Sequence, residues 1–181
     1  FFIFYSMFGF QRVGDLIWAA GDMRTKGFLI GGTSGKTTLA GEGLQHQDGH
    51  SHLMAGTIPN LKAYDPAYSY EIAIIIQHGL KDMYQWQNNH FYYITVENEN
   101  YIHPKLPNYE ITEGVIKGIY CLKKKTNSKG PKIQLLASGP MLNEAIKASK
   151  LLKSDWGIDS TIWSVTSYSE LHKEAEDIER W

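Results

Sequence analysis

Cysteine is almost absent from the sequence, in which Cys121 is the single thiol among 181 residues. One cysteine excludes an internal disulfide, and it also excludes a zinc site built from several thiolates. Such sparing use of cysteine is typical of proteins from a reducing compartment. We therefore expect a cytoplasmic protein.

Long apolar runs and an excess of charge of either sign are missing as well. The aliphatic run at residues 72–76 is far shorter than the ~20 residues that a membrane-spanning helix needs. The 18 basic and 19 acidic residues give a net charge of −1, which offers no electrostatic footprint for nucleic acid or for an anionic membrane. We expect neither partner. Because 43% of the residues are hydrophobic, the chain can bury a core.

An initiator methionine is also lacking. The chain opens on the apolar residues FFIFY, which carry no basic flank of the kind that a signal peptide has, and it stops abruptly at ERW. We expect the chain to be a piece of a longer polypeptide.

Strand and helix patterns alternate through the first hundred residues. Runs of β-forming residues predict strands, the first of them buried, and apolar residues at helical spacing predict helices. Asp65 followed by Pro66 is typical of a helix start in which the carboxylate is the N-cap. The pattern predicts strands at 1–5, 28–32, 58–64 and 91–96 and helices at 10–23 and 67–85. This order predicts an α/β fold with a mostly parallel sheet flanked by helices.

A second unit follows Pro104 and Pro107, which mark an extended linker. Strands are predicted at 115–122, 133–137 and 161–165, and a helix at 140–156 is predicted to end at Gly157. The last two strands and the helix between them make a β-α-β unit, which must be right-handed if both strands share a sheet.

Residues 41–52, GEGLQHQDGHSH, contain three histidines, two acids and three glycines with no periodicity that would bury one face. They are predicted to form a loop. Glycine lets the backbone approach a ligand, and histidine titrates near neutrality, so such a loop can hold and protonate a substrate. From these residues alone three interpretations stay open: an organic cofactor or substrate site, a zinc pair of His50 with His46 or His52, and a solvated loop.

The sequence GGTSGKTT at residues 31–38 looks like a phosphate-binding loop. Ile30, however, stands where that motif needs its first glycine, and no helical pattern follows Thr37. Both departures exclude nucleotide hydrolysis, whereas a cluster of backbone amides that contacts some anion stays open.

Five ungapped blocks in one order resemble a known enzyme family: YSMFGFQR at 5–12, GGTSGKTT at 31–38, GEGLQH at 41–46, DGHSH at 48–52 and YDPAY at 64–68. The chain closely resembles the homodimeric, bacterial-type pyruvate dehydrogenases, the thiamine-diphosphate-dependent decarboxylating component of the pyruvate dehydrogenase complex. NENY at 98–101 and WSVTS at 163–167 extend the resemblance over essentially the whole chain.

The resemblance implies a transketolase-like fold, with residues 1–102 as the later part of a pyrimidine-binding domain, 103–111 as a linker and 112–181 as the beginning of a transketolase C-terminal-like domain. It implies oxidative decarboxylation of pyruvate and transfer of the acetyl group to the lipoyl group of dihydrolipoyl acetyltransferase. The family binds thiamine diphosphate across a dimer interface, so a second subunit is implied. Mg²⁺ is implied too, with its ligands outside this chain.

The same resemblance predicts site residues. Tyr5 and Phe8 match the aromatics that pack on the aminopyrimidine ring of the cofactor, and Arg12 lies in the same block. His46 matches an active-site histidine that contacts the substrate during the reaction. Glu42 and His50 lie in matching blocks and are predicted to be catalytic with His46. No metal ligand is predicted in this chain.

Two elements of the family pattern are missing from the sequence. The carboxylate that protonates the pyrimidine lies upstream of these blocks, and no Gly-Asp-Gly motif for metal and diphosphate is present. We therefore expect the segment alone to be inactive. Two alternatives stay open: a related 2-oxo acid dehydrogenase or transketolase-like enzyme, and a non-catalytic module for dimerisation or docking.

Overall fold

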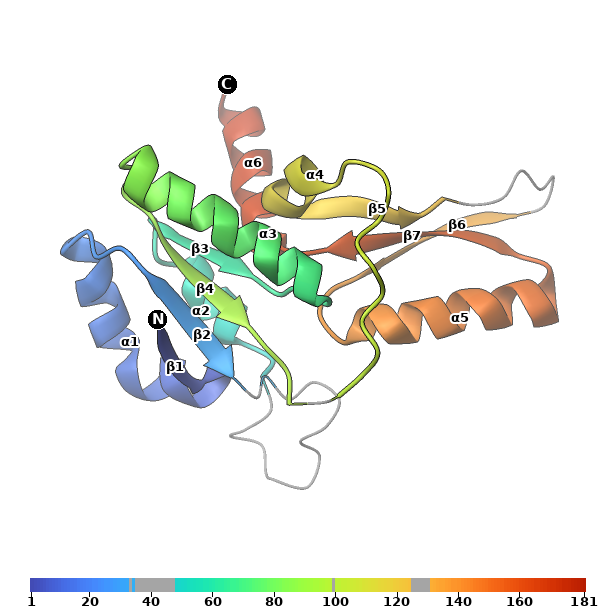
Figure 1. The fold of residues 1–181 in the computed structure, drawn as a ribbon, viewed down its shortest axis with the longest axis horizontal. Helices are drawn as coiled ribbons and strands as arrows, with labels where there is room; N and C mark the ends of the chain where they lie inside the picture. Colours follow the sequence, from blue (N-terminus) through green and yellow to red (C-terminus); the bar gives the residue numbers. More distant parts are fainter. Residues whose placement is uncertain (33, 35–47, 99, 125–130) are drawn as a thin grey trace.

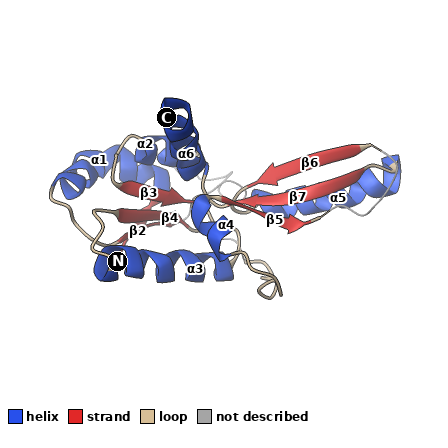
Figure 2. Cartoon of the chain, turned by 90° about the horizontal axis from the view of Figure 1, so that it is seen from above, coloured by secondary structure: helices blue, strands red, loops and turns tan. Residues whose placement is uncertain are grey.

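The computed structural model describes residues 1–32, 34, 48–98, 100–124 and 131–181. These residues form two sheets that lie end to end, each with helices packed against it (Figures 1 and 2). We call residues 1–98 the first unit and residues 112–181 the second unit. In the described part of the chain, no helix is both long and apolar enough to span a bilayer.

The first sheet has four parallel strands in the order β1-β2-β4-β3. Their bounds are Phe2–Tyr5 for β1, Phe28–Gly32 for β2, Leu61–Tyr64 for β3 and Phe91–Thr95 for β4. The register pairs Tyr5 with Gly32, Gly31 with Thr95, and Tyr64 with Ile94, so all four strands end at the same edge. The predicted mostly parallel α/β sheet is thus confirmed.

Helices cover both faces of this sheet (Figure 2). One face is covered by α1, Ser6–Asp22, and α2, Ser51–Gly56. The other is covered by α3, Ser69–Leu80, which continues as the π-helix η2, Lys81–Gln85. Side chains of β4 alternate between the two cores: Phe91 and Tyr93 pack with α1 and α2, and Tyr92 and Ile94 pack with α3. All five residues of β4 are buried, as expected for a central parallel strand.

Two predictions for the first unit are wrong in detail. The first strand is not buried, since Phe2 and Ile3 are 60% and 71% exposed because β1 is an edge strand that pairs only with β2 in the described sheet. The helix predicted at 67–85 begins at Ser69, and Asp65 is not its cap. The Asp65 carboxylate instead accepts a hydrogen bond at the sheet edge, and Glu71 accepts the N–H of Tyr68 at the helix start.

The second sheet has three strands in the order β5-β7-β6. Their bounds are Ile119–Lys123 for β5, Lys132–Ala137 for β6 and Asp159–Val165 for β7. β7 runs parallel to β6 and antiparallel to β5. The connecting helix α5, Met141–Trp156, ends at Gly157, whose φ of +65° closes the helix as predicted.

The second unit also contains two helices where the sequence predicted none. Residues 115–117, predicted as strand, belong to α4, Thr112–Lys117. This helix ends at Gly118, whose φ of +105° is open to glycine, and β5 starts only after it. The last helix, α6, Tyr168–Arg180, begins at Ser167, whose hydroxyl accepts the N–H of Glu170.

A buried carboxylate joins the two units. The Oε1 atom of Glu71 accepts hydrogen bonds from the Tyr120 hydroxyl at 2.6 Å and the Ser164 hydroxyl at 2.7 Å, both in the second sheet. Its Oε2 atom accepts the backbone N–H groups of Ala67 at 2.5 Å and Tyr68 at 3.0 Å. Glu71 is fully buried, and its donors come from both units. The second unit is therefore fastened to the start of α3.

Candidate active site

The candidate site lies at the edge where the four parallel strands end. Tyr5 ends β1, Ser34 follows β2, Asp65 follows β3 and Thr95 ends β4. In open parallel sheets, ligands bind at this carboxyl edge because the loops and helix starts that can reach a ligand gather there. The second unit borders the same edge through residues near Gly139 and Tyr168.

An aromatic pair stands at the turn from β1 to α1. The rings of Tyr5 and Phe8 meet edge to face with centroids 6.4 Å apart. The guanidinium of Arg12 lies over the Phe8 ring, 3.6 Å from its centroid, in a cation–π contact. Tyr5 is 52% exposed. The structure thus brings the three predicted cofactor-binding residues together.

Polar side chains form a second group at the ends of β3 and β4. The Thr95 hydroxyl donates to Asp65 Oδ1 at 2.6 Å, and His52 Nε2 lies 2.9 Å from the same hydroxyl. Thr95 and Asp65 are buried, and the His52 ring packs against Tyr93 with centroids 5.3 Å apart. A hydrogen-bonded row of a carboxylate, a hydroxyl and an imidazole therefore follows the sheet edge.

Asp48 fixes the start of α2, next to the histidine-rich segment. Its two carboxylate oxygens accept the backbone N–H and the hydroxyl of Ser51, at 3.0 and 2.5 Å. Asp48 is buried, and its own N–H donates to the carbonyl of Ser34 at 3.3 Å. The chain therefore returns to the strand edge before α2 begins.

Hydrogen bonds join the residues that follow β4 to Ser34, which follows β2. The buried Ser34 hydroxyl donates to the Glu97 carboxylate, and the Ser34 N–H donates to the Val96 carbonyl at 3.2 Å. Burial and the nearby Glu97 carboxylate raise the pKa of Tyr101 to about 12. Its hydroxyl donates to the Ala67 carbonyl.

A small cavity of about 140 Å³ opens between the two units at this edge. The first unit contributes Asp48, His52 and Asp65 to its wall, and the second contributes Ser138 and Tyr168. Among the residues that the structure describes, no three His, Cys, Asp or Glu side chains are grouped so as to hold a metal ion.

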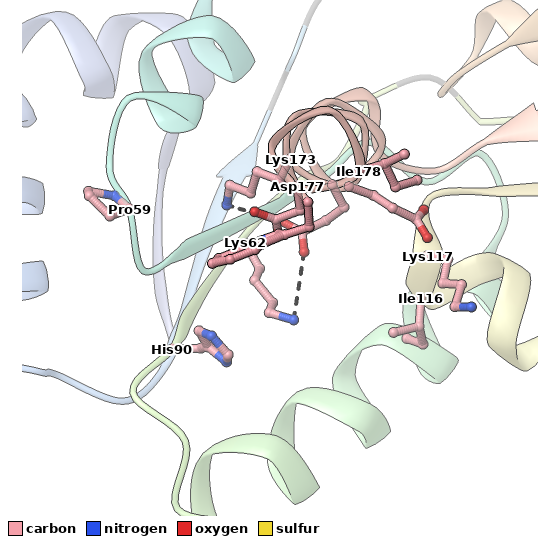
Figure 3. Close-up of a pocket in the computed structure, with 11 residues that line it drawn as sticks. Pro59, Lys62, His90, Ile116, Lys117, Lys173, Asp177 and Ile178 are labelled. Atoms are coloured by element: carbon pink, nitrogen blue, oxygen red, sulfur yellow. Dashed lines mark hydrogen bonds and ion pairs between the residues drawn. The ribbon is translucent and has the colours of Figure 1, made fainter.

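A larger cavity, of about 600 Å³, lies at the opposite, amino edge of the first sheet (Figure 3). Lys62 and His90 of the first unit line it together with residues of α4 and α6. Glu170 pairs with Lys62 at 3.6 Å and with Lys173 at 3.1 Å, so the opposite charges in its wall largely compensate each other. This cavity shares no residue with the strand ends where the predicted site residues gather.

The predicted catalytic residues differ in where they fall. Glu42 and His46 lie outside the described residues. His50 is exposed immediately before α2, and its carbonyl accepts the N–H of Met54 at 3.0 Å. His52, predicted to lie in the loop, belongs to α2.

Sequence reasoning missed the row formed by Asp65, Thr95 and His52. Thr95 stands in a run of β-formers and gave no polar signal of its own. Asp65 was assigned to a helix cap because Pro66 follows it. The one available signal was that Asp65 and Thr95 both stand where a predicted strand ends, because the ends of parallel strands share one edge of a sheet.

Two family models match the chain. Residues 1–104 match the model described as the pyruvate dehydrogenase E1 component middle domain. Residues 118–180 match the model described as the transketolase-like TK C-terminal domain.

Curated relatives match over the full length of the chain. It is 56% identical to the pyruvate dehydrogenase E1 component of Pseudomonas aeruginosa, 56% to that of Escherichia coli and 52% to that of Cupriavidus necator. In each case the match covers 100% of this chain and 20% of the relative. The chain therefore spans about a fifth of the length of these relatives.

Solved structures show the same fold. The transketolase from Campylobacter jejuni superposes with a TM-score of 0.76 over 94% of this chain and 25% of that one, at 19% sequence identity. The transketolase from Leishmania mexicana gives a TM-score of 0.71 over 94% of this chain and 23% of that one, at 16% identity. These likenesses show a transketolase-like α/β fold.

Proposed function

Because this chain belongs to the pyruvate dehydrogenase E1 component family, we propose that the complete protein carries out the thiamine-diphosphate-dependent oxidative decarboxylation of pyruvate. It then passes the acetyl group to the lipoyl group of dihydrolipoyl acetyltransferase. The identity of 56% over the whole chain to relatives named pyruvate dehydrogenase E1 component supports this proposal.

The observation that carries the proposal is the grouping of Tyr5, Phe8 and Arg12 at the carboxyl edge. An exposed aromatic ring at a strand end offers a flat apolar surface, and the aminopyrimidine of thiamine diphosphate is a flat ring that such a surface fits. Arg12 covers one face of Phe8, which restricts the rotamers of the Phe8 ring. Tyr5 and Phe8 would hold the pyrimidine, and Arg12 would keep Phe8 in place.

When bound, thiamine diphosphate supplies the nucleophilic carbon and the electron sink for loss of CO₂. The chain's own residues would bind, orient and exchange protons. We assign His46 to donate a hydrogen bond or proton to the substrate, because an imidazole titrates near neutral pH, and we assign Glu42 and His50 to catalysis as well. We place the ligands of Mg²⁺ and of the diphosphate outside this chain.

The remaining assignments complete the proposal. Residues 1–102 form the later part of a pyrimidine-binding domain, and residues 112–181 begin a transketolase C-terminal-like domain after the linker 103–111. The complete protein works as a homodimer in the cytoplasm, with its cofactor at the subunit interface. Apolar side chains of β1 such as Phe2 and Ile3, exposed at the sheet edge, leave area for contacts beyond this chain.

The test is an assay of the complete protein for pyruvate-dependent reduction of an artificial electron acceptor. It is run with and without thiamine diphosphate and Mg²⁺, for the wild type and for His46→Ala. We expect activity to need the cofactor and to fall at least about 100-fold in the variant while cofactor affinity holds. A wild type that reduces the acceptor with a longer 2-oxo acid but not with pyruvate would refute the substrate assignment.

A further inference from the structure

Asp65 lies where the two units meet, and its backbone is held from both sides by the second unit. Its N–H donates to the carbonyl of Thr166, just after β7, at 2.8 Å. Its carbonyl accepts the N–H of Gly139, between β6 and α5, at 3.0 Å. The position of Asp65 at the end of β3 is therefore set by the second sheet as well as by the first.

The side chain of Asp65 is linked to His52 by hydrogen bonds through the Thr95 hydroxyl. The Thr95 hydroxyl has a single proton, which it gives to Asp65 Oδ1 at 2.6 Å rather than to the Tyr64 carbonyl at 3.3 Å. The Thr95 oxygen therefore accepts from His52 Nε2 at 2.9 Å. The chain of donors fixes the imidazole tautomer with the proton on Nε2, and it fixes the direction of the ring.

Gly139 of the second unit presses against the same carboxylate. Its φ is +50°, and a Cβ atom added there would lie 3.0 Å from both Asp65 oxygens. The absence of a side chain at Gly139 consequently lets the second unit approach Asp65 this closely.

We propose that Asp65, Thr95 and His52 form a positioning chain through which the second unit orients α2 at the carboxyl edge of the first sheet. His52 lies in the first turn of α2, which follows His50 directly, so a shift of His52 moves the residue that we assign to catalysis. His52 is a positioning residue in this scheme. Its catalytic readout rests on the proposed function.

The first test replaces Thr95, the middle residue of the positioning chain. In the complete protein, Thr95→Val keeps the shape of the side chain but removes the hydroxyl, whereas Thr95→Ser keeps the hydroxyl. We expect Thr95→Val to lower kcat about 10- to 100-fold, since a displacement of about 1 Å has effects of this size. KM for pyruvate and the Kd for thiamine diphosphate should stay within about twofold, and Thr95→Ser should restore kcat to within about twofold.

The second test replaces Gly139 of the second unit, which contacts Asp65 of the positioning chain. Gly139→Ala and Gly157→Ala place an alanine at similar positive φ angles, +50° and +65°. Nothing lies within 4 Å of the new Cβ at Gly157, whereas Asp65 lies 3.0 Å from it at Gly139. The two variants share the backbone strain and differ in the contact with Asp65. We expect Gly139→Ala to reproduce the loss of kcat and Gly157→Ala to keep kcat within about twofold.

A measurement without substrate separates this inference from the proposed function. Hydrogen exchange of the backbone amides in residues 50–56 should rise in Thr95→Val and Gly139→Ala, and it should stay at the wild-type level in Thr95→Ser and Gly157→Ala. If the wild type does not act on pyruvate, the proposed function fails while the exchange data still decide whether the chain positions α2.

Three results would overturn the inference. Folded Thr95→Val with wild-type exchange shows that the hydroxyl does not hold α2. A raised exchange with kcat within about twofold overturns the catalytic part of the inference, because α2 is then held but its position does not serve the reaction. Equal losses in Gly139→Ala and Gly157→Ala show that backbone strain, and not Asp65, is responsible. If Thr95→Val does not fold, the glycine pair decides alone.

Discussion

Replacement of Glu71 should loosen the junction between the two units. Its carboxylate accepts four hydrogen bonds, and it is fully buried, so Glu71→Ala leaves all four donors without their acceptor. The Tyr120 hydroxyl can turn to Tyr70, whose hydroxyl lies 2.9 Å away. The N–H groups of Ala67 and Tyr68 cannot turn, and each buried unsatisfied donor costs about 1–3 kcal/mol. With the cavity left behind, we expect a loss of about 3–5 kcal/mol.

Glu71→Gln should cost much less, because the amide can satisfy the same partners. Its oxygen can accept the two backbone N–H groups, and its NH₂ group can donate to the hydroxyl oxygens of Tyr120 and Ser164, which accept as readily as they donate. The four bonds become weaker without the charge, but the cost of burying a charge also disappears. We expect a net loss of about 1 kcal/mol.

The assay is hydrogen exchange of the Ala67 and Tyr68 amides in the complete protein. A loss of about 3–5 kcal/mol corresponds to exchange about 100- to 4,000-fold faster, since each 1.4 kcal/mol is tenfold. The control is Glu144→Ala, which removes an exposed glutamate from the first turn of α5, where it pairs with Lys147 at 2.7 Å. Glu71→Ala that exchanges no faster than this control, or Glu71→Gln that is as damaging as Glu71→Ala, would refute the reasoning.

Three further variants test other parts of the structure. Gly31→Ala should lower stability by about 1–3 kcal/mol in thermal unfolding, because the new Cβ meets the ring of Tyr93, whereas Gly14→Ala, with nothing within 4 Å, should not. Burial raises the pKa of Asp82, but the hydrogen bonds that its carboxylate accepts lower it by more, so the pKa lies below its ordinary value of 3.8. The stability that Asp82 contributes above pH 3.8 should therefore be lost as the pH falls below that value. Unfolding at several pH values should show Asp82→Asn lacking this loss; the donors concerned are Asn88, Tyr92 and His90. Tyr5→Ala should weaken thiamine diphosphate binding about tenfold by titration calorimetry, and Tyr5→Phe should not, since the ring provides the contact.

The parts of the fold that the sequence predicted correctly are those where one local signal dominates. β4 is an unbroken run of β-formers and α5 has a regular apolar stripe, so each matches its prediction closely. The strand predicted at 115–122 is placed too early at its start, because α4 has only six residues and its Val115 and Ile116 favour a strand by propensity. Their burial against α3 and the positive φ of Gly118 outweighed that propensity.

The candidate site divides in the same way. Tyr5, Phe8 and Arg12 lie within residues 5–12, so the resemblance of one short block was sufficient to name all three. The row of Asp65, Thr95 and His52 joins residues that are far apart in the sequence. Thr95 is 30 positions from Asp65 and 43 positions from His52. No local pattern reports such a distance, because it depends on the order in which the strands pair.

Asp65 shows how a tertiary contact overrides a local signal. An N-cap carboxylate contributes about 1 kcal/mol, whereas a buried hydrogen bond to a charged group contributes about 1.5–3 kcal/mol. The Thr95 hydroxyl and the backbone of Gly139 therefore hold Asp65 at the sheet edge. The N–H groups of Ala67 and Tyr68, just before α3, then need another acceptor. Glu71 fills that place through its Oε2 atom while its Oε1 atom binds the second unit. The use of Asp65 at the sheet edge thus explains why two buried carboxylates, Asp65 and Glu71, lie at the junction between the units.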